Sequence, residues 1–251
     1  DLDIDTLHGY NRPRSRSDRY GSVLRLHNTL TKTAQTVQPS RGRRVGMYTC
    51  GPTVYRDAHI GNLRSYLMAD WIRRALVQQG VEIDHVKNVT DVGHMRQEVL
   101  ERGEDKVVAA AIAEGKSPAQ IARFYTDRFL EDERKLNISR AQHIPKATDH
   151  ISEMLEIVES LVDKGYAYEV EGNVYFGVSQ FSDYGKLSGN IQEEELLEAV
   201  RVEADPLKRD PRDFTLWKRA EPGRELKWPS PWGDGFPGWH IECSAMSIKY
   251  L

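Results

Sequence analysis

The sequence contains little cysteine and no long apolar run. Only two of its 251 residues are cysteines, which excludes a small secreted fold held together by several disulfides. No uninterrupted apolar stretch reaches the length of about 20 residues that a membrane-spanning helix needs. These absences indicate a protein without membrane segments that works in a reducing, cytoplasmic compartment.

An excess of positive charge is also missing. The chain has 35 Lys and Arg against 38 Asp and Glu, a formal net charge of −3. Domains that bind nucleic acid usually carry a basic face or a high pI, so the charge by itself does not indicate such a partner. The length allows one large core with an inserted lobe.

The N-terminal residues lack the apolar core of a signal peptide and the acid-free pattern of a transit peptide. Residues 1–20 mix four arginines with four aspartates, and we predict a polar, solvated arm over residues 1–21. The sequence begins without methionine and stops at Leu251 within an apolar stretch. Both ends suggest a fragment or a shortened gene product.

Residues 44–89 carry the pattern of a β-loop-α-β unit. A short, partly alternating segment over 44–50 is closed by Gly51-Pro52 and reads as a strand. Apolar residues then recur at three- and four-residue steps from Asn62 to Gln79, before Gly80, which predicts a helix with one buried face. Residues 81–89 return to a strand pattern. A parallel crossover of this kind predicts a Rossmann-like α/β lobe.

A different pattern follows Asp91. Ser117 and Gln120 frame a capping box with proline at the first helical position, and a second helix is predicted from about Asp149. The segments 166–170 and 174–178 alternate around a Glu-Gly-Asn turn, which predicts a β-hairpin. We therefore expect a helix-and-hairpin lobe inserted into the Rossmann-like domain.

The loop between the predicted strand and helix carries the strongest local signal. A helix N-terminus attracts phosphate through its backbone N–H groups and its dipole. Gly61 allows close approach of a ligand, and the His59 imidazole can donate to a phosphoryl oxygen. On these residues alone, a second interpretation remains, in which His59 only caps the helix.

Several segments, in collinear order over about residues 23–251, resemble motifs of the cysteinyl-tRNA synthetases. They are MYTCGPTVY at 47–55, HIGN at 59–62, NVTDVGH at 88–94, DFTLWK at 213–218, WPSPWG at 228–233 and PGWHIECSAM at 237–246. The likeness implies an incomplete Rossmann-like class I synthetase fold with a connective insertion. It divides the chain into the arm at 1–21, a first catalytic half at 22–96, the insertion at 97–210 and the start of the second half at 211–251.

The resemblance also implies a metal site. In that family two cysteines, a histidine and a glutamate bind zinc, and the positions of the two cysteines match Cys50 and Cys243. A Zn–S bond to the substrate would separate cysteine from serine without an editing site. By composition alone, two isolated cysteines are most simply buried, inert thiols. The histidine-and-glutamate block and the KMSKS loop of the family do not occur in this sequence.

The remaining site residues are likewise carried over from the family. His59 and Asn62 match catalytic positions and, with Gly61, would contact ATP, which is expected to bind with Mg²⁺. Gly51, Thr53, Thr90 and Trp239 would line the cysteine pocket. Asn62 replaces the second histidine of the family's HIGH motif and cannot carry charge. Thr90 and Trp239 could equally be packing residues.

The implied activity is ATP-dependent activation of L-cysteine and its transfer to tRNA(Cys), with this chain carrying only part of the site. Two alternatives stay open. One is a cysteine:amino-sugar ligase that uses the same adenylate. The other is a shortened, non-catalytic module that binds cysteine or nucleotide, or that needs a partner chain to complete its site.

Overall fold

The computed structural model describes residues 24–39, 42–92, 115–189 and 205–251. The predicted arm at 1–21 and the end of the NVTDVGH motif lie outside the described residues. The α-helices are α1 (Ile60–Gln78), α4 (Pro118–Lys135), α5 (Ile151–Asp163) and α7 (Trp239–Tyr250), and the short 3-10 helices are η2 (Ala147–His150) and η3 (Val178–Gln180). The strands are β1 (Arg25–Asn28), β2 (Thr33–Thr36), β3 (Arg44–Thr49), β4 (Glu82–Lys87), β5 (Ala167–Val170), β6 (Asn173–Phe176), β7 (Phe214–Arg219) and β8 (Gly235–Pro237).

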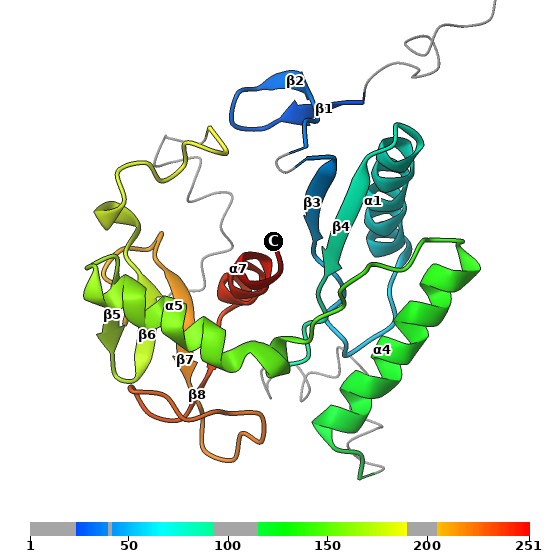
Figure 1. Cartoon of the computed structure of the whole chain (residues 1–251). Coiled ribbons are helices and arrows are strands. Elements are labelled where there is room, and N and C mark those ends of the chain that lie inside the picture. The colour runs from blue at the N-terminus through cyan, green and yellow to red at the C-terminus, as the bar shows by residue number, and fades with distance from the viewer. Residues whose placement is uncertain (1–23, 40–41, 93–114, 190–204) are drawn as a thin grey trace, which may run out of the picture.

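The β3–α1–β4 unit is the parallel crossover that the sequence predicts. Strands β3 and β4 pair in parallel, with Arg44 opposite Glu82 and Thr49 opposite Lys87. Residues 143–146 run parallel along the far edge of β4, where the Lys87 amide donates to the His143 carbonyl at 3.0 Å. Helix α1 packs on β4, and Figure 1 shows it alongside the two strands. This mixed α/β unit is Rossmann-like, as the sequence predicts.

Helix α4 begins with the capping box that the sequence predicts. The Ser117 side chain accepts from the Gln120 amide, the Gln120 side chain accepts from the Ser117 amide, and Pro118 opens the helix. Its apolar face meets α1 where the rings of Tyr66 and Phe129 lie 5.3 Å apart, edge to face. Helix α4 is thereby anchored on the Rossmann-like unit.

The predicted hairpin belongs to a four-stranded antiparallel sheet in the order β5-β6-β7-β8. Its turn uses Glu171 and Gly172, both at positive φ (52° and 81°), which is the backbone geometry of a tight two-residue hairpin turn. Strands β7 and β8 lie after residue 210, so the hairpin pairs with residues assigned by sequence to the second catalytic half. Helix α5 packs on β5 and begins directly after the 3-10 helix η2.

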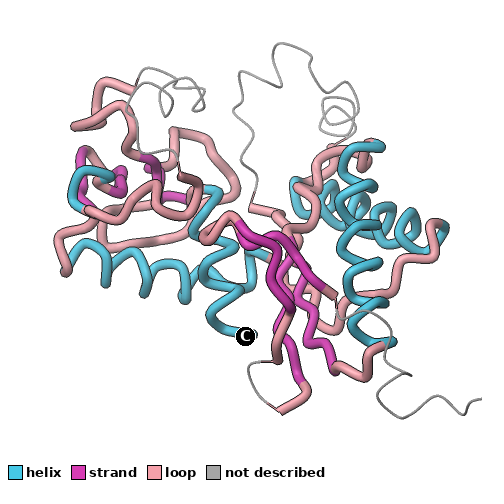
Figure 2. Tube along the Cα trace, turned by 90° about the horizontal axis from the view of Figure 1, so that it is seen from above, coloured by secondary structure: helices cyan, strands magenta, loops and turns pink. Residues whose placement is uncertain are grey.

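Helix α7 lies between the Rossmann-like unit and the four-stranded sheet in Figure 1. It contacts α5 and β7, and its buried residues Ala245 and Met246 join Trp217 in the largest apolar cluster. Figure 2 shows the central strands from above, with helices on both sides. This helix brings the C-terminal end of the chain back to β3, where Leu251 contacts Gly46.

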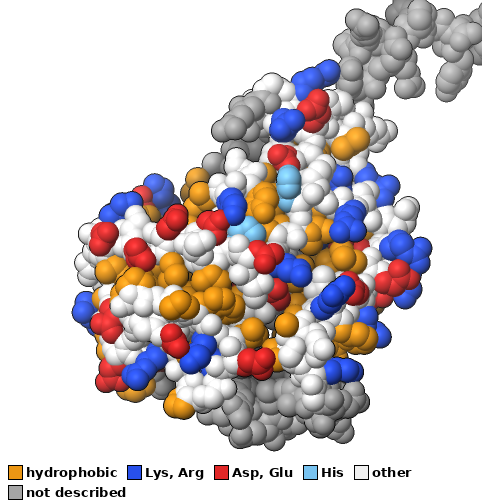
Figure 3. Space-filling model, turned by 60° about the horizontal axis from the view of Figure 1, so that its bottom comes forward, with side chains coloured by type: hydrophobic (Ala, Val, Ile, Leu, Met, Phe, Trp, Pro, Cys, Tyr) orange, Lys and Arg blue, Asp and Glu red, His pale blue; other side chains and the backbone are white. Residues whose placement is uncertain are grey.

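Among the described residues, no helix combines the length and the apolar character that a bilayer span requires. The face in Figure 3 carries side chains of both charge signs among hydrophobic ones.

Candidate functional site

The first half of the candidate site is the loop that leaves β3. Cys50 follows the last residue of the strand, and Gly51 then crosses so close to β4 that a Cβ atom there would lie 1.8 Å from the Asn88 carbonyl oxygen. Only glycine permits this approach. The loop is held by Thr90, whose amide donates to the Pro52 carbonyl at 3.0 Å and whose carbonyl accepts from the Val54 amide at 3.1 Å.

The second half of the site is the start of α7. Gly238 is its N-cap residue, and a Cβ at this position would lie 2.1 Å from the Thr215 carbonyl oxygen. The Gly238 amide donates to the Leu216 carbonyl at 2.8 Å. Strand β7 therefore fixes where the first turns of α7, and with them Cys243, are placed.

These two halves bring Cys50 and Cys243 together, although 193 residues separate them in sequence. Their sulfur atoms lie 3.6 Å apart, much farther than the bond length of about 2.05 Å in a disulfide. Two thiolates that bind one tetrahedral zinc ion at about 2.3 Å lie about 3.8 Å apart. The pair has the spacing of two ligands to a shared soft metal ion.

The thiols influence each other's acidity. The hydrogen bond between the two sulfurs lowers the pKa of Cys50 to about 6, and the same bond, together with burial, raises the pKa of Cys243. Burial, followed by the interaction with Cys243, raises the pKa of the neighbouring Tyr48 phenol, so Tyr48 stays protonated beside the sulfurs.

Two buried residues that sequence reasoning did not assign lie near the thiols. The Asn88 amide oxygen accepts from the Gly51 amide at 3.1 Å and lies 4.0 Å from the Cys243 sulfur. The Glu242 carboxylate accepts from the Thr90 hydroxyl at 2.8 Å. A signal existed for Asn88, because strand alternation places its side chain on the same face as that of Thr90, two residues later.

His59 and Asn62 form the capping box at the start of α1. The His59 Nδ1 atom accepts from the Gly61 amide at 3.0 Å, and the Asn62 side-chain oxygen accepts from the His59 amide at 3.2 Å. His59 therefore caps the helix. It is compatible with ligand binding, because a neutral imidazole that accepts at Nδ1 carries its proton on Nε2, as a donor.

The other predicted cysteine-pocket residues lie on the same two segments. Thr53 forms a parallel bridge with Thr90, so the loop that follows Cys50 pairs with the segment that follows β4. Trp239 is the first residue of α7 and is 53% exposed.

Three or more His, Cys, Asp or Glu side chains do not converge as a metal site within the described parts of the chain.

Comparison with known proteins shows which family the chain is similar to. The family of tRNA synthetases class I (C) catalytic domains matches residues 36–251. Curated proteins named cysteine–tRNA ligase are similar to the chain. Those of Carboxydothermus hydrogenoformans and Chlorobium chlorochromatii are 49% and 47% identical over 228 and 229 residues. Each alignment covers 91% of this chain, and 46% and 48% of those proteins. The chain thus spans about half the length of these relatives.

Among solved structures, an arginyl-tRNA synthetase from Thermus thermophilus aligns with a TM-score of 0.40 and 12% identity. The alignment covers 88% of this chain and 38% of that one.

Proposed function

The chain belongs to the family of class I (C) tRNA synthetase catalytic domains, and from this membership we propose that it carries part of the active site of a cysteine–tRNA ligase. Such an enzyme joins the carboxylate of L-cysteine to the α-phosphorus of ATP, which forms cysteinyl-AMP and releases pyrophosphate, and then transfers the cysteinyl group to tRNA(Cys). The observation that carries the proposal is the 3.6 Å separation of Cys50 and Cys243.

The donor set fits a zinc ion as two of its ligands. Thiolate is the soft ligand that zinc prefers, and the lowered pKa of Cys50, about 6, favours its thiolate form at neutral pH. When bound, zinc would supply a bond to a substrate thiol that a serine hydroxyl cannot match. The remaining ligands would come from residues beyond these two cysteines, in the full-length gene product or in a partner chain.

The start of α1 is proposed to bind ATP. Nδ1 of His59 is occupied by the Gly61 amide, so Nε2–H is directed to other acceptors, such as a phosphate oxygen. When the carboxylate of cysteine attacks the α-phosphorus and pyrophosphate leaves, this donor would stabilise the growing negative charge. Asn62 holds the His59 backbone and so orients the imidazole. We expect Mg²⁺ to accompany ATP.

The loop after Cys50 is proposed to form the cysteine pocket. Gly51 lets the loop run close to β4 beside the thiols, since any larger residue would meet the Asn88 carbonyl. Thr53 and Thr90, which pair with each other, would line the pocket, and the exposed ring of Trp239 would cover the bound amino acid. We also propose that the chain is a catalytic domain interrupted by an insertion at 97–210. Its location would be the cytoplasm, where free thiols stay reduced.

The test uses the full-length gene product in cysteine-dependent ATP–pyrophosphate exchange. In C243S the hydroxyl retains the shape of the side chain but is a poor zinc ligand. We expect its exchange rate to fall by more than about a hundredfold, the upper end of the loss caused by mutating residues that only orient a ligand. Ser244→Ala, at an exposed position beside Cys243, is the matched control and should exchange at the wild-type rate.

The outcomes separate the candidate functions. Exchange followed by charging of tRNA(Cys) supports the ligase, whereas exchange with transfer only to an amino sugar supports the related ligase. Absence of cysteine-dependent exchange in the wild-type gene product would rule out both and leave a binding module. Wild-type exchange by C243S would contradict the proposed role of the thiol pair.

A further inference from the structure

A chain of buried polar side chains joins the two cysteine-bearing segments. Asn88, Thr90 and Glu242 are 1%, 7% and 0% exposed. Asn88 directly follows β4, Thr90 lies two residues later, and Glu242 lies in the first turn of α7. Polar groups are rarely buried so deeply unless hydrogen bonds replace the lost water.

The hydrogen bonds run in one continuous series. The Gly51 amide donates to the Asn88 oxygen at 3.1 Å, the Asn88 amide group donates to the Thr90 hydroxyl at 3.2 Å, and that hydroxyl donates to the Glu242 carboxylate at 2.8 Å. The Thr90 hydroxyl accepts one bond and donates the other, so the directions of all three are mutually consistent.

The two ends of this series are adjacent to the thiols in sequence. Gly51 follows Cys50 directly, and Glu242 directly precedes Cys243. The two cysteine-bearing segments are far apart in sequence, since 152 residues separate Thr90 from Glu242. The series therefore spans the same interface as the pair of sulfurs, and a change in its length would alter the distance between them.

We propose that Asn88 and Glu242 are positioning residues that set the separation of the Cys50 and Cys243 thiols. Thr90 connects them, so its hydroxyl has a bridging role in addition to lining the proposed pocket. Only the use of this spacing for a metal ion and a thiol substrate rests on the proposed function. The spacing itself is a property of the folded chain.

The carboxylate of Glu242 suits this role better than an apolar side chain would. Its oxygen accepts from Thr90 in a site shielded from water, where a hydrogen bond is stronger than at the surface and an unpaired polar group is costly. An apolar residue would fill the space without fixing the direction of the first turn of α7. Direction, more than packing, decides where the Cys243 sulfur points.

The test measures thiol spacing with phenylarsine oxide, which loses its oxygen as water when two nearby thiols bind its arsenic. Two thiols at 3.6 Å should bind one equivalent tightly. We expect N88A and E242A to bind about tenfold more weakly, the effect of losing about 1.4 kcal/mol of buried hydrogen bonding. E242Q keeps an acceptor oxygen for Thr90 and should retain the wild-type affinity.

Asp213→Asn is the matched control for a general loss of stability. Asp213 is also a buried carboxylate, 3% exposed, but it accepts from the Tyr168 hydroxyl and the Val178 amide. D213N should lower the unfolding midpoint without changing the affinity for phenylarsine oxide. If D213N binds phenylarsine oxide as weakly as N88A and E242A do, Asn88 and Glu242 only stabilise the fold, and the proposal is overturned.

Folded N88A and E242A chains that bind phenylarsine oxide as wild type does would also overturn it. If the alanine variants do not fold, T90V and T90S decide the question, because they differ by the bridging hydroxyl. T90V should lose about tenfold in affinity, by the same reasoning, and T90S should lose little. The reagent needs no zinc, ATP or cysteine, so a failure of the proposed ligase activity leaves this result unaffected.

Discussion

Removal of one partner from the buried ion pair between Lys87 and Glu133 should strongly destabilise the folded state. The two side chains are 1% and 4% exposed, and they join the end of β4 to α4. The ammonium group also lies 4.9 Å and 5.9 Å from the ring centres of Tyr66 and Phe129. Replacement of Lys87 by methionine fills the space but leaves a buried carboxylate without its partner.

The expected loss is large because water does not reach the site. Removal of one member of a buried ion pair typically costs about 3–5 kcal/mol, and we expect K87M to fall in this range. Burial already raises the pKa of Glu133, against the lowering effect of Lys87. In K87M that lowering effect is gone, so the pKa rises further and the carboxyl is neutral over a wider pH range.

The sign of the pH effect follows from the raised pKa. A carboxyl whose pKa is higher in the folded state favours folding when protonated, and this contribution is lost as the pH rises through the folded pKa. The deficit of K87M should therefore be smaller at a pH of about 5 than at about 8. Urea unfolding followed by far-UV circular dichroism measures both values.

The double variant K87M/E133L supplies the control. Replacement of both charges by apolar groups is often neutral, so the double variant should recover most of the lost stability. A K87M chain as stable as wild type at both pH values would refute the reasoning. So would a double variant that is less stable than K87M.

Three further results are expected. G51A should lose about 1–3 kcal/mol of stability in urea unfolding, because its methyl group would meet the Asn88 carbonyl at 1.8 Å; an unchanged midpoint would contradict the close approach. H59A should lose about 0.5–2 kcal/mol as a helix cap is removed, whereas H59N keeps a capping oxygen and should restore stability without restoring pyrophosphate exchange. The hydrogen bond from Lys249 lowers the pKa of Glu153 to about 2. The contribution of this pair to stability is therefore present above about pH 4.5 and lost as the pH falls toward 2. K249M should remove this loss of stability from the acid unfolding curve, and an unchanged curve would contradict it.

Local sequence signals predicted the elements that have strong periodicity or clear caps. The helix from Asn62 to Gln79 is α1, and the capping box at Ser117 is the start of α4. The hairpin at 166–178 was located to within two residues at its ends. These features depend on neighbours in sequence, which is why the sequence alone was sufficient.

Long-range pairing could not be predicted in the same way. Residues 143–146 bond to β4 as an extended segment, although they carry no strand pattern and include a proline. Strands β7 and β8 complete the sheet of the hairpin from beyond residue 210. Such pairings depend on the packing of α5 and α7 rather than on local propensity.

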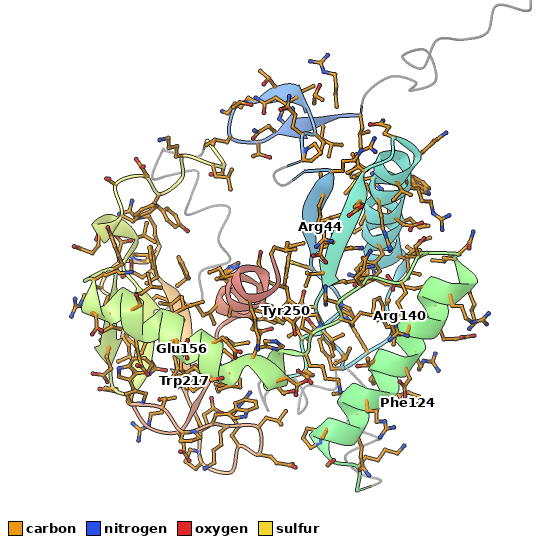
Figure 4. The ribbon with its side chains drawn as sticks, viewed as in Figure 1. Arg44, Phe124, Arg140, Glu156, Trp217 and Tyr250 are labelled. Carbon is orange, nitrogen blue, oxygen red and sulfur yellow. The ribbon has the colours of Figure 1, made fainter. Side chains whose placement is uncertain are left out.

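The candidate site was likewise predicted only in part from the sequence. The resemblance of motifs singled out Cys50 and Cys243, and the structure brings them together. The links between them were not foreseen, because Glu242 and Thr90 become neighbours only when α7 packs between the two sheets. Tyr250, at the other end of α7, shows this packing in Figure 4, where it lies near the segment that joins α4 to α5. Its hydroxyl is 3.2 Å from His150 Nε2.

The most direct test of the central claim is X-ray absorption at the metal edge of the zinc-loaded full-length gene product. Without substrate, the spectrum should show two sulfur ligands at about 2.3 Å. Addition of L-cysteine should raise the number to three, and L-serine should leave it unchanged. A spectrum without sulfur ligands, or one that responds equally to cysteine and serine, would contradict the account.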